Sequence, residues 1–462
     1  MQSTLNERKC LRNAAVIFLW VVFLGAAASF AQLPTATILG VVRDASGAVV
    51  PQANLTARNV ETGQTRTTVS AADGSYRFAA LPVGNYEVQV AQSGFQSAVR
   101  SGLRLTVGQE ALVNFSLQVG AVEQRVEVTA EAPLVNTTSS TLGGVVDEQK
   151  VAELPLNGRN FVDLALLQAG VQKSRIRTGG GSIDGTAYSS NGAPLASNNA
   201  TLDGARVNSL GSSSTATSGT GNTLGIEGIQ EFRVVTNALS AEYGMAMGSQ
   251  MMIVSKSGTN SFHGSLFEYH RNDDLDARNF FDYGANRAVN PRRIPPFVRN
   301  NFGGSLGGPI VRDKTFFHTN LEMLRERKSD TRIVNVIDPA CKVDGGCVPR
   351  INPAVKNWLD IWPNPNLPGN RFADNPSSPL DQQYGQMRID HAFSESDSFF
   401  GRYTIDDSER IQPRNLPGVG SLSASRAQYL TFSENHVVSP TVINQARFSY
   451  SRSFIQDINT YT

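Results

Sequence analysis

The sequence predicts a mainly β protein with three parts: a β-sandwich, a small α/β unit, and an incomplete antiparallel β-barrel that spans a membrane. Short strands separated by turns fill the chain from Thr37 to Leu117. Met251 to Val254 form a strand that is apolar on both faces, as in a buried sheet. From Gly258 onward, longer strands alternate apolar and polar residues, which is typical of a membrane barrel.

Composition excludes two classes of protein. Lysine and arginine number 41 against 40 aspartate and glutamate, a net charge of +1 that gives no attractive field for nucleic acid. We therefore expect no nucleic-acid partner. The mean hydropathy of -0.22, with one long apolar run, excludes a helical membrane protein.

The single apolar run lies at the N-terminus and predicts a signal peptide over residues 1–31. Arg8, Lys9 and Arg12 form a basic region before the apolar stretch from Ala14 to Ala28. A small-residue site follows, with cleavage between Ala31 and Gln32. The apolar stretch is shorter than the roughly 20 residues that cross a bilayer, which favours cleavage over a retained anchor.

Two cysteines remain after the signal. Cys341 and Cys347 are separated by Lys-Val-Asp-Gly-Gly, a flexible turn long enough for the two sulfurs to meet. Because an exported chain enters an oxidising compartment, we predict a disulfide; the alternative is two free thiols in a loop.

The first part, residues 32–119, has strands and turns spaced as in a small antiparallel sandwich. Tyr86, Val88 and Val90 are expected to share the core face, and Leu103 to Leu117 forms the last strand.

Residues 120–132 predict a separate extended strand. Val126, Val128 and Ala130 alternate, and Pro133 ends the segment. Such a strand, with free backbone groups, can be bound by β-augmentation. A linker strand belonging to the sandwich has the same pattern, so both interpretations stay open.

Residues 133–257 predict the α/β unit. Leu164, Leu167 and Gln168 are helically periodic after an Asn157-Gly158 turn. Asp203-Gly204 marks another turn, and Ser209 to Gly225 is a low-complexity loop.

Residues 258–462 predict barrel strands with polar side chains inward and apolar side chains outward. In the first strand, Phe267 and Tyr269 lie on one face and Glu268 and His270 on the other. The same alternation sets Phe317, Leu321 and Met323 against His318, Asn320 and Glu322, and Met387 and Ile389 against Gln386, Arg388 and Asp390.

Seven such strands are expected, with Asp273 to Pro296 and Ile337 to Ser378 as extracellular loops. Transporters with a plugged lumen have about 22 strands, so we expect an N-terminal fragment of a longer protein.

No catalytic or metal motif is present, so we expect neither an enzyme nor a cofactor. The five histidines are scattered and form no zinc or catalytic motif. Arg388 and Asp390 share one strand face and are expected to form a solvated structural pair. The histidines are His263, His270, His318, His391 and His436.

Two segments, GVVRDASGAVVPQANLTA and DGSYRFAALPVGNYEVQVAQSGF, resemble the carboxypeptidase regulatory-like domain. This resemblance implies a transthyretin-like sandwich, grouped with carbohydrate-binding-like folds. It implies no peptidase activity, because the domain is an accessory to a separate enzyme. A spacer or docking role and a sugar-binding role remain open.

The segments LPLNGRNF, LDGARVN and GIEGIQEFRVVTNALSAEYGMAMGSQMMIVSKSGTN together resemble the plug domain of TonB-dependent outer-membrane receptors, in the Oar-like subfamily. The resemblance assigns the plug to residues 133–257. One departure is the methionine-rich GMAMGSQMMIV, and methionine is an adaptable core residue. The resemblance marks as plug motif residues Leu154, Pro155, Asn157, Gly158, Arg159, Asp203, Gly204, Glu231, Tyr243 and Gly244.

The segment EVTA resembles the TonB box, which binds the energy-transducing protein TonB in the periplasm. The corresponding residues are Val126, Glu127, Val128, Thr129 and Ala130.

The resemblance implies a receptor in the outer membrane of a Gram-negative cell, with a periplasmic N-terminal domain. Outer-membrane lipid, the TonB complex and a large or scarce solute are its implied partners. A siderophore, an oligosaccharide and a peptide all fit as the solute. The alternative is a non-transporting surface adhesin or carbohydrate-binding protein.

Overall fold

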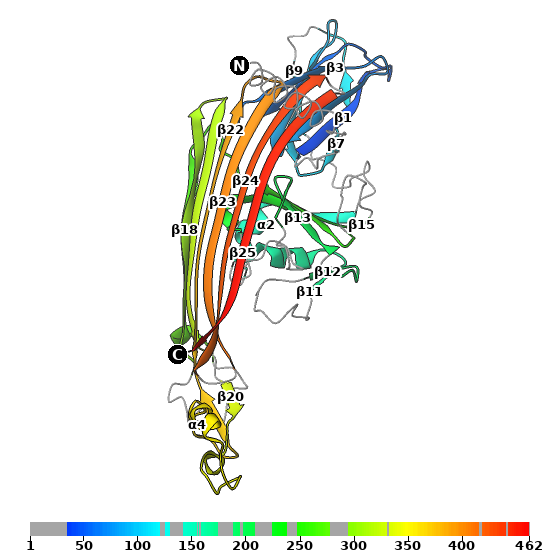
Figure 1. The fold of residues 1–462 in the computed structure, drawn as a ribbon. Coiled ribbons are helices and arrows are strands. Elements are labelled where there is room, and N and C mark those ends of the chain that lie inside the picture. Colours follow the sequence, from blue (N-terminus) through cyan, green and yellow to red (C-terminus); the bar gives the residue numbers. More distant parts are fainter. Residues whose placement is uncertain are drawn as a thin grey trace, which may run out of the picture.

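The computed structural model has three parts that lie against one another: an N-terminal sandwich, an inner domain, and a tall curved wall of strands (Figure 1). Among the residues described, no helix is long and apolar enough to cross a membrane. The structure describes residues 35–120, 125–129, 142–154, 156, 159–173, 188–194, 197–207, 224–237, 247–277, 294–329, 332–414, 418–439 and 442–461. The expected cleavage site at Ala31 and Gln32 lies outside these ranges.

The sandwich (residues 35–129) packs two sheets face to face around one apolar core. Tyr86, Val88 and Val90 are buried in this core, which confirms the expected face. One sheet contains β4 (Ser75–Pro82), β1 (Thr35–Asp44), β7 (Glu110–Leu112) and β8 (Phe115–Leu117). The other has the order β3 (Thr65–Val69), β2 (Asn54–Asn59), β5 (Gly84–Ala91), β6 (Ser97–Leu105) and β9 (Arg125–Thr129).

The stretch from Leu103 to Leu117, expected as one strand, is broken by a turn. After β6 ends at Leu105, the Thr106 amide and hydroxyl both donate to Gln109 Oε1, at 2.8 and 3.0 Å. Gly108 has a φ of 66°, a conformation that glycine adopts without steric cost. The turn brings Val107 and Gly108 to the edge of the sandwich that faces the inner domain.

Residues 125–129 are extended, as expected, but their backbone is not free. Strand β9 pairs in parallel with β6, in a register that sets Ser97 opposite Arg125 and Ser101 opposite Thr129. One edge of β9 is therefore occupied, and the strand is the last member of a sandwich sheet.

The inner domain (residues 142–257) is built on a mixed sheet. The central strand β16 is buried along its whole length, as its apolar composition predicts. The sheet has the order β10 (Leu142–Val146), β15 (Ile229–Asn237), β16 (Gln250–Ser255), β13 (Asn199–Leu202) and β14 (Ala205–Arg206). Around it lie α2 (Glu148–Glu153), the 3₁₀ helices η1 (Phe161–Leu167) and η3 (Ile226–Gly228), and the hairpin of β11 (Val171–Lys173) and β12 (Tyr188–Ser190).

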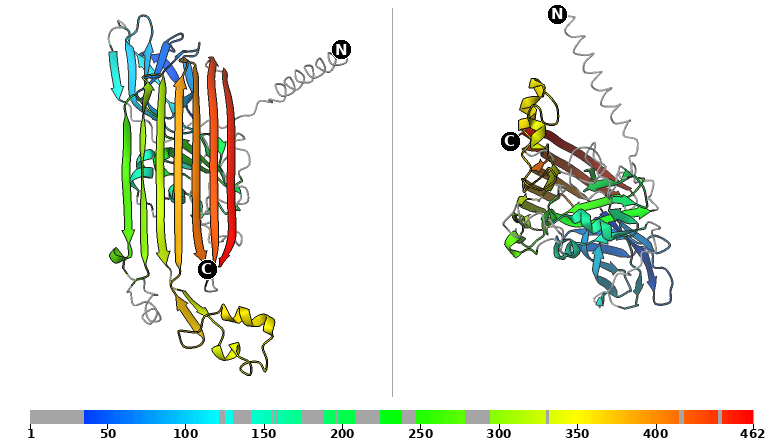
Figure 2. Two further views of the ribbon diagram at one scale, coloured as in Figure 1. Left: turned by 60° about the vertical axis from the view of Figure 1, so that its left-hand side comes forward. Right: turned by 90° about the horizontal axis from the view of Figure 1, so that it is seen from below.

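The wall is one seven-stranded antiparallel sheet in which sequential strands are neighbours, the strand number expected from the alternation. His318, Asn320 and Glu322 are buried while Leu321 is 60% exposed, which confirms the polar-in, apolar-out pattern of β19. The strands are β17 (His263–Asn272), β18 (Phe297–Val311), β19 (Thr315–Ser329), β22 (Ser377–Ala392), β23 (Asp397–Pro413), β24 (Val419–Ser439) and β25 (Val442–Tyr461). The inner domain lies on the concave side of this sheet, and the sandwich lies at one end (Figure 2).

Strand β17 departs from this pattern. Its inward face carries Phe267 and Tyr269, whose rings lie 4.1 and 5.2 Å from the Arg159 guanidinium of the inner domain. Leu266 is 93% exposed on the other face, beside the polar Glu268 and His270. Aromatic rings point inward here because they provide π faces for a cation.

At the end of the wall opposite the sandwich, residues 332–376 form a separate folded insertion (Figure 1). A disulfide joins Cys341 to Cys347, with Cα atoms 4.6 Å apart. The insertion contains β20 (Arg332–Asn335), the 3₁₀ helix η6 (Pro339–Lys342), α4 (Pro353–Asp360) and β21 (Arg371–Asp374).

Candidate functional site

Asp203 occupies the tip of the two-residue turn between β13 and β14. Asp203 and Gly204 have φ values of 49° and 78°, the pair of positive φ angles that an Asp-Gly hairpin turn requires. The turn points the carboxylate toward the wall, where it is only 1% exposed. Ser255 of β16 donates to this carboxylate through its backbone amide at 2.9 Å and its hydroxyl at 2.8 Å.

Two wall arginines neutralise the buried Asp203. Arg402 Nε lies 3.1 Å from Oδ2, and Arg388 Nη1 lies 3.4 Å from Oδ1. Burial alone would raise the pKa of Asp203, but Arg402, Arg388 and the Ser255 hydrogen bonds together hold this pKa below its ordinary value. Asp203 is therefore a carboxylate in the assembled structure.

The same arginines also bind backbone and hydroxyl groups across this contact. Arg402 is fully buried and donates to Leu202 O at 3.4 Å and to Thr431 Oγ1 at 2.8 Å. Arg388 donates to Ser255 Oγ at 2.9 Å and pairs with Asp390 at 2.7 Å. The expected Arg388 and Asp390 pair thus exists, and it is partly buried, with side chains 12% and 19% exposed.

Arg159 makes the second contact between inner domain and wall. Its guanidinium pairs with Glu227 of the inner domain at 3.0 Å and with Glu322 of β19 at 3.2 Å. Phe267 and Tyr269 of β17 lie beside the same guanidinium. Arg159 lies in a loop and has a φ of 53°. Its contacts with two carboxylates and two aromatic rings hold this loop against the wall.

Glu231 and Arg233, on strand β15, face the sandwich. Glu231 Oε1 accepts the Val107 amide at 2.5 Å, and Arg233 Nη1 donates to Gly108 O at 2.8 Å. Burial raises the pKa of Glu231 to about 7, although the Val107 hydrogen bond, Arg104 and Arg233 act to lower it and Asp147 acts to raise it. A buried apolar cluster shared by the two domains surrounds these polar contacts: Val83, Val107, Val235, Met252 and Val254.

The sandwich also touches the turns at its end of the wall. The Asn260 amide donates to Glu61 O at 3.0 Å, and Thr65 Oγ1 donates to Glu395 Oε1 at 3.0 Å. Gly63 lies beside Asp313, since a Cβ at this position would lie 2.4 Å from Asp313 Oδ1. The sandwich is thus bound to the inner domain and to the wall at once.

The structure does not gather the residues marked by the plug resemblance into one site. Three of them, Arg159, Asp203 and Glu231, each lie at a different contact between parts. Gly204 completes the Asp203 turn, and Leu154 is partly exposed after α2. The backbone of residues 126–129 lies in β9. Outside the described residues lie Ala130, Pro155, Asn157, Gly158, Tyr243 and Gly244.

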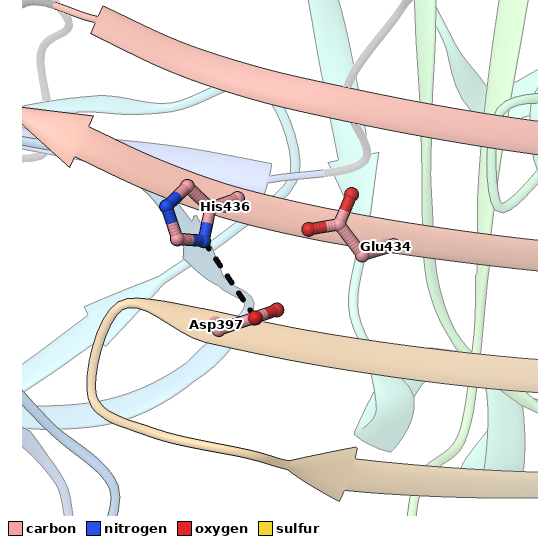
Figure 3. A group of neighbouring side chains, drawn as sticks. All are labelled: Asp397, Glu434 and His436. Atoms are coloured by element: carbon pink, nitrogen blue, oxygen red, sulfur yellow. Dashed lines mark ion pairs between the residues drawn. The ribbon is translucent and has the colours of Figure 1, made fainter.

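In the part of the chain that the structure describes, one group of side chains has the composition of a metal site. Asp397, Glu434 and His436 lie together at the sandwich end of the wall, and His436 Nδ1 is 3.6 Å from Asp397 Oδ2 (Figure 3). These side chains are partly exposed, and the pair explains the geometry of His436 without a metal.

Two known families match the chain, one near its N-terminus and one in its C-terminal half. Residues 37–118 match the family Carboxypeptidase regulatory-like domain. Residues 254–462 match the family Outer membrane beta barrel domain. The first match covers the sandwich and the second the wall, which is therefore an outer-membrane structure.

The chain is 28% identical to the TonB-dependent transporter Oar of Myxococcus xanthus, over 72% of this chain. It is a homologue of the TonB-dependent transporters. The chain spans 30% of the length of Oar. Because this relative is a transporter, the homology agrees with the expectation that the protein is not an enzyme.

Two solved structures are among those that match part of the chain. The outer membrane transporter YddB from Escherichia coli is 15% identical, with a TM-score of 0.45 over 69% of this chain and 39% of its own. The siderophore receptor PirA from Acinetobacter baumannii is 14% identical, with a TM-score of 0.37 over 68% of this chain and 44% of its own.

Sequence patterns did not reveal which residues meet across the contacts. Arg402 lies on the polar face of an alternating strand, and nothing local distinguishes it from other inward side chains. Val107 and Gly108 carry one local signal, a glycine within an apolar stretch, which can mark a turn.

Replacing Asp203 by asparagine is expected to loosen the inner domain. The change leaves Arg402 buried without its carboxylate, at a cost of about 3 to 5 kcal/mol in unfolding free energy. Asp407→Asn is the matched control, because Asp407 pairs with Arg426 at an exposed site and its loss costs about 1 kcal/mol or less. Hydrogen exchange of β13 in the intact protein measures the effect of both substitutions. Equal effects of the two substitutions would show that Asp203 does not hold the inner domain.

Docking of the sandwich on β15 is expected to weaken as the pH rises. The docked pKa of Glu231, about 7, exceeds the ordinary 4.5, so the stabilisation is complete below pH 4.5 and is lost as the pH passes 7. The change amounts to at most about 3 kcal/mol.

Spin labels at Ser46 and Lys314 would report the distance between sandwich and wall across pH 4.5 to 8. Glu231→Gln keeps the acceptor oxygen and is expected to abolish the pH dependence. A wild-type distance distribution that does not change with pH would refute the role of Glu231.

Proposed function

We propose that the protein is a TonB-dependent outer-membrane transporter whose inner domain is the plug that closes the barrel. The observation that carries this proposal is the contact between Asp203 and the wall residues Arg388 and Arg402. A domain seated against the polar concave face of a membrane wall obstructs the lumen. Its contacts there include ion pairs and hydrogen bonds, which a mechanical pull can break and which can form again.

The homology to Oar supports transport as the activity. Transport by this route needs no covalent chemistry in the chain. The plug must be displaced or remodelled, and the energy comes from the inner-membrane proton gradient through a partner protein. The cargo is a solute too large or too scarce for diffusion through pores, such as a siderophore, an oligosaccharide or a peptide.

Strand β9 is the proposed TonB-binding segment. Its backbone is extended from Arg125 to Thr129, and among the described residues β6 is the strand that pairs with it, along one edge. The outer edge has the geometry that a β-augmenting partner needs. Binding by TonB at Val126 to Ala130 would couple this partner to the chain just before the plug.

Proline at position 128 is expected to weaken TonB binding severely. Val128→Pro removes a backbone donor and fixes φ, so a strand that binds through its main chain loses affinity by at least about tenfold. Val128→Thr keeps the donor and the β-branched shape, and its affinity is expected to stay near that of the wild type. Titration of the intact receptor with the periplasmic domain of TonB measures both.

A synthetic peptide of residues 120–133 provides the same comparison without the rest of the chain. Equal TonB affinity for the proline and threonine variants, in receptor and in peptide, would refute this binding segment.

A further inference from the structure

A series of hydrogen-bonded contacts connects the proposed TonB strand to the centre of the plug sheet. Strand β9 is paired along its whole length with β6. Strand β6 leads directly into the Val107 and Gly108 turn. The backbone of that turn is hydrogen-bonded to the side chains of Glu231 and Arg233 of β15, and β15 pairs with both β10 and β16. A displacement of β9 therefore acts on the sandwich.

The sandwich also obstructs the end of the wall at which it lies. It contacts β15 of the plug on one side and the turn residues Asn260, Asp313 and Glu395 on the other. With the sandwich in this position, the plug sheet is covered at that end. The plug must remain seated, or the sandwich must move.

We infer that the sandwich is a latch on the plug, and that a pull on β9 undocks the Val107 and Gly108 turn from β15 before the plug moves. This inference rests on the proposed function, because it takes TonB as the protein that pulls. It gives the sandwich a regulatory role: the part that carries the TonB strand also holds the plug closed.

The two sets of contacts differ in a way that favours undocking first. The sandwich is held on β15 by main-chain hydrogen bonds to Glu231 and Arg233 and by a small apolar cluster. Breaking them exposes these groups to water, which can bind them in turn. The plug is held on the wall by Asp203 between two arginines and by its large apolar core, which includes Tyr384, Ala427 and Tyr429 of the wall. Separating the plug from the wall therefore exposes more apolar surface than separating the sandwich from β15.

Thiol labelling in cells tests the inference. Val107 is fully buried at the sandwich and plug contact, so Val107→Cys in the intact receptor should react slowly with a membrane-permeant maleimide while the sandwich is docked. Cys341 and Cys347 are joined and do not compete. We expect severalfold faster labelling in energised cells that contain TonB than in cells treated with a protonophore or lacking TonB.

Two further variants distinguish undocking of the sandwich from its unfolding. Val83→Cys reports on the same apolar cluster from β4 and its following turn, and should respond as Val107→Cys does. Leu55→Cys lies in the sandwich core away from the plug, and its labelling should not depend on TonB. TonB-dependent labelling of Leu55→Cys would mean that the sandwich unfolds and would overturn the latch. Unchanged labelling of both Val107→Cys and Val83→Cys would also overturn it.

Failure of the latch can be distinguished from failure of the proposed function. If the peptide of residues 120–133 binds the periplasmic domain of TonB while both contact thiols stay protected, the latch alone is wrong. If the peptide does not bind and labelling is independent of TonB, the proposed TonB segment is wrong as well.

Discussion

The arrangement of the chain depends on one buried carboxylate. Asp203 lies between Arg388 and Arg402 of the wall and accepts two hydrogen bonds from Ser255. A carboxylate in this position is stable only while the inner domain and the wall are together, since each supplies charge that the other must neutralise. Asp203 and Gly204 both have positive φ, and the tight turn that they form directs the carboxylate toward the wall.

The contacts between the parts combine apolar and charged groups. The sandwich has its own apolar core, whereas the core of the inner domain also includes Tyr384, Ala427 and Tyr429 of the wall. Beside this shared core, Arg159 pairs with Glu322, and Asp203 pairs with its arginines. Because ion pairs and hydrogen bonds require a specific geometry, they fix the position of the inner domain on the wall.

Local patterns were sufficient to predict the strands and their faces. Alternation along β19 identified His318, Asn320 and Glu322 as inward, and they are buried against the inner domain. The same reasoning failed for Phe267 and Tyr269, because their inward orientation depends on Arg159, which is distant in sequence. Partners across a contact are not encoded in periodicity.

The sandwich also contains features that local sequence patterns did not predict. The stretch from Leu103 to Leu117 has the composition of one strand, yet it turns at Val107 and Gly108, where the inner domain binds it. Likewise, the sequence left open whether residues 125–129 were a free strand or a sandwich strand. The pairing of residues 125–129 with the edge of β6 decides between these two interpretations, because it makes the segment a strand of the sandwich.

The most direct test is a cryo-electron microscopy structure of the intact protein in lipid nanodiscs. We expect Asp203 in contact with Arg388 and Arg402, and the Val107 and Gly108 turn bound to Glu231. An inner domain seated with Asp203 away from both arginines, or a sandwich with no fixed position at the barrel end, would contradict this expectation.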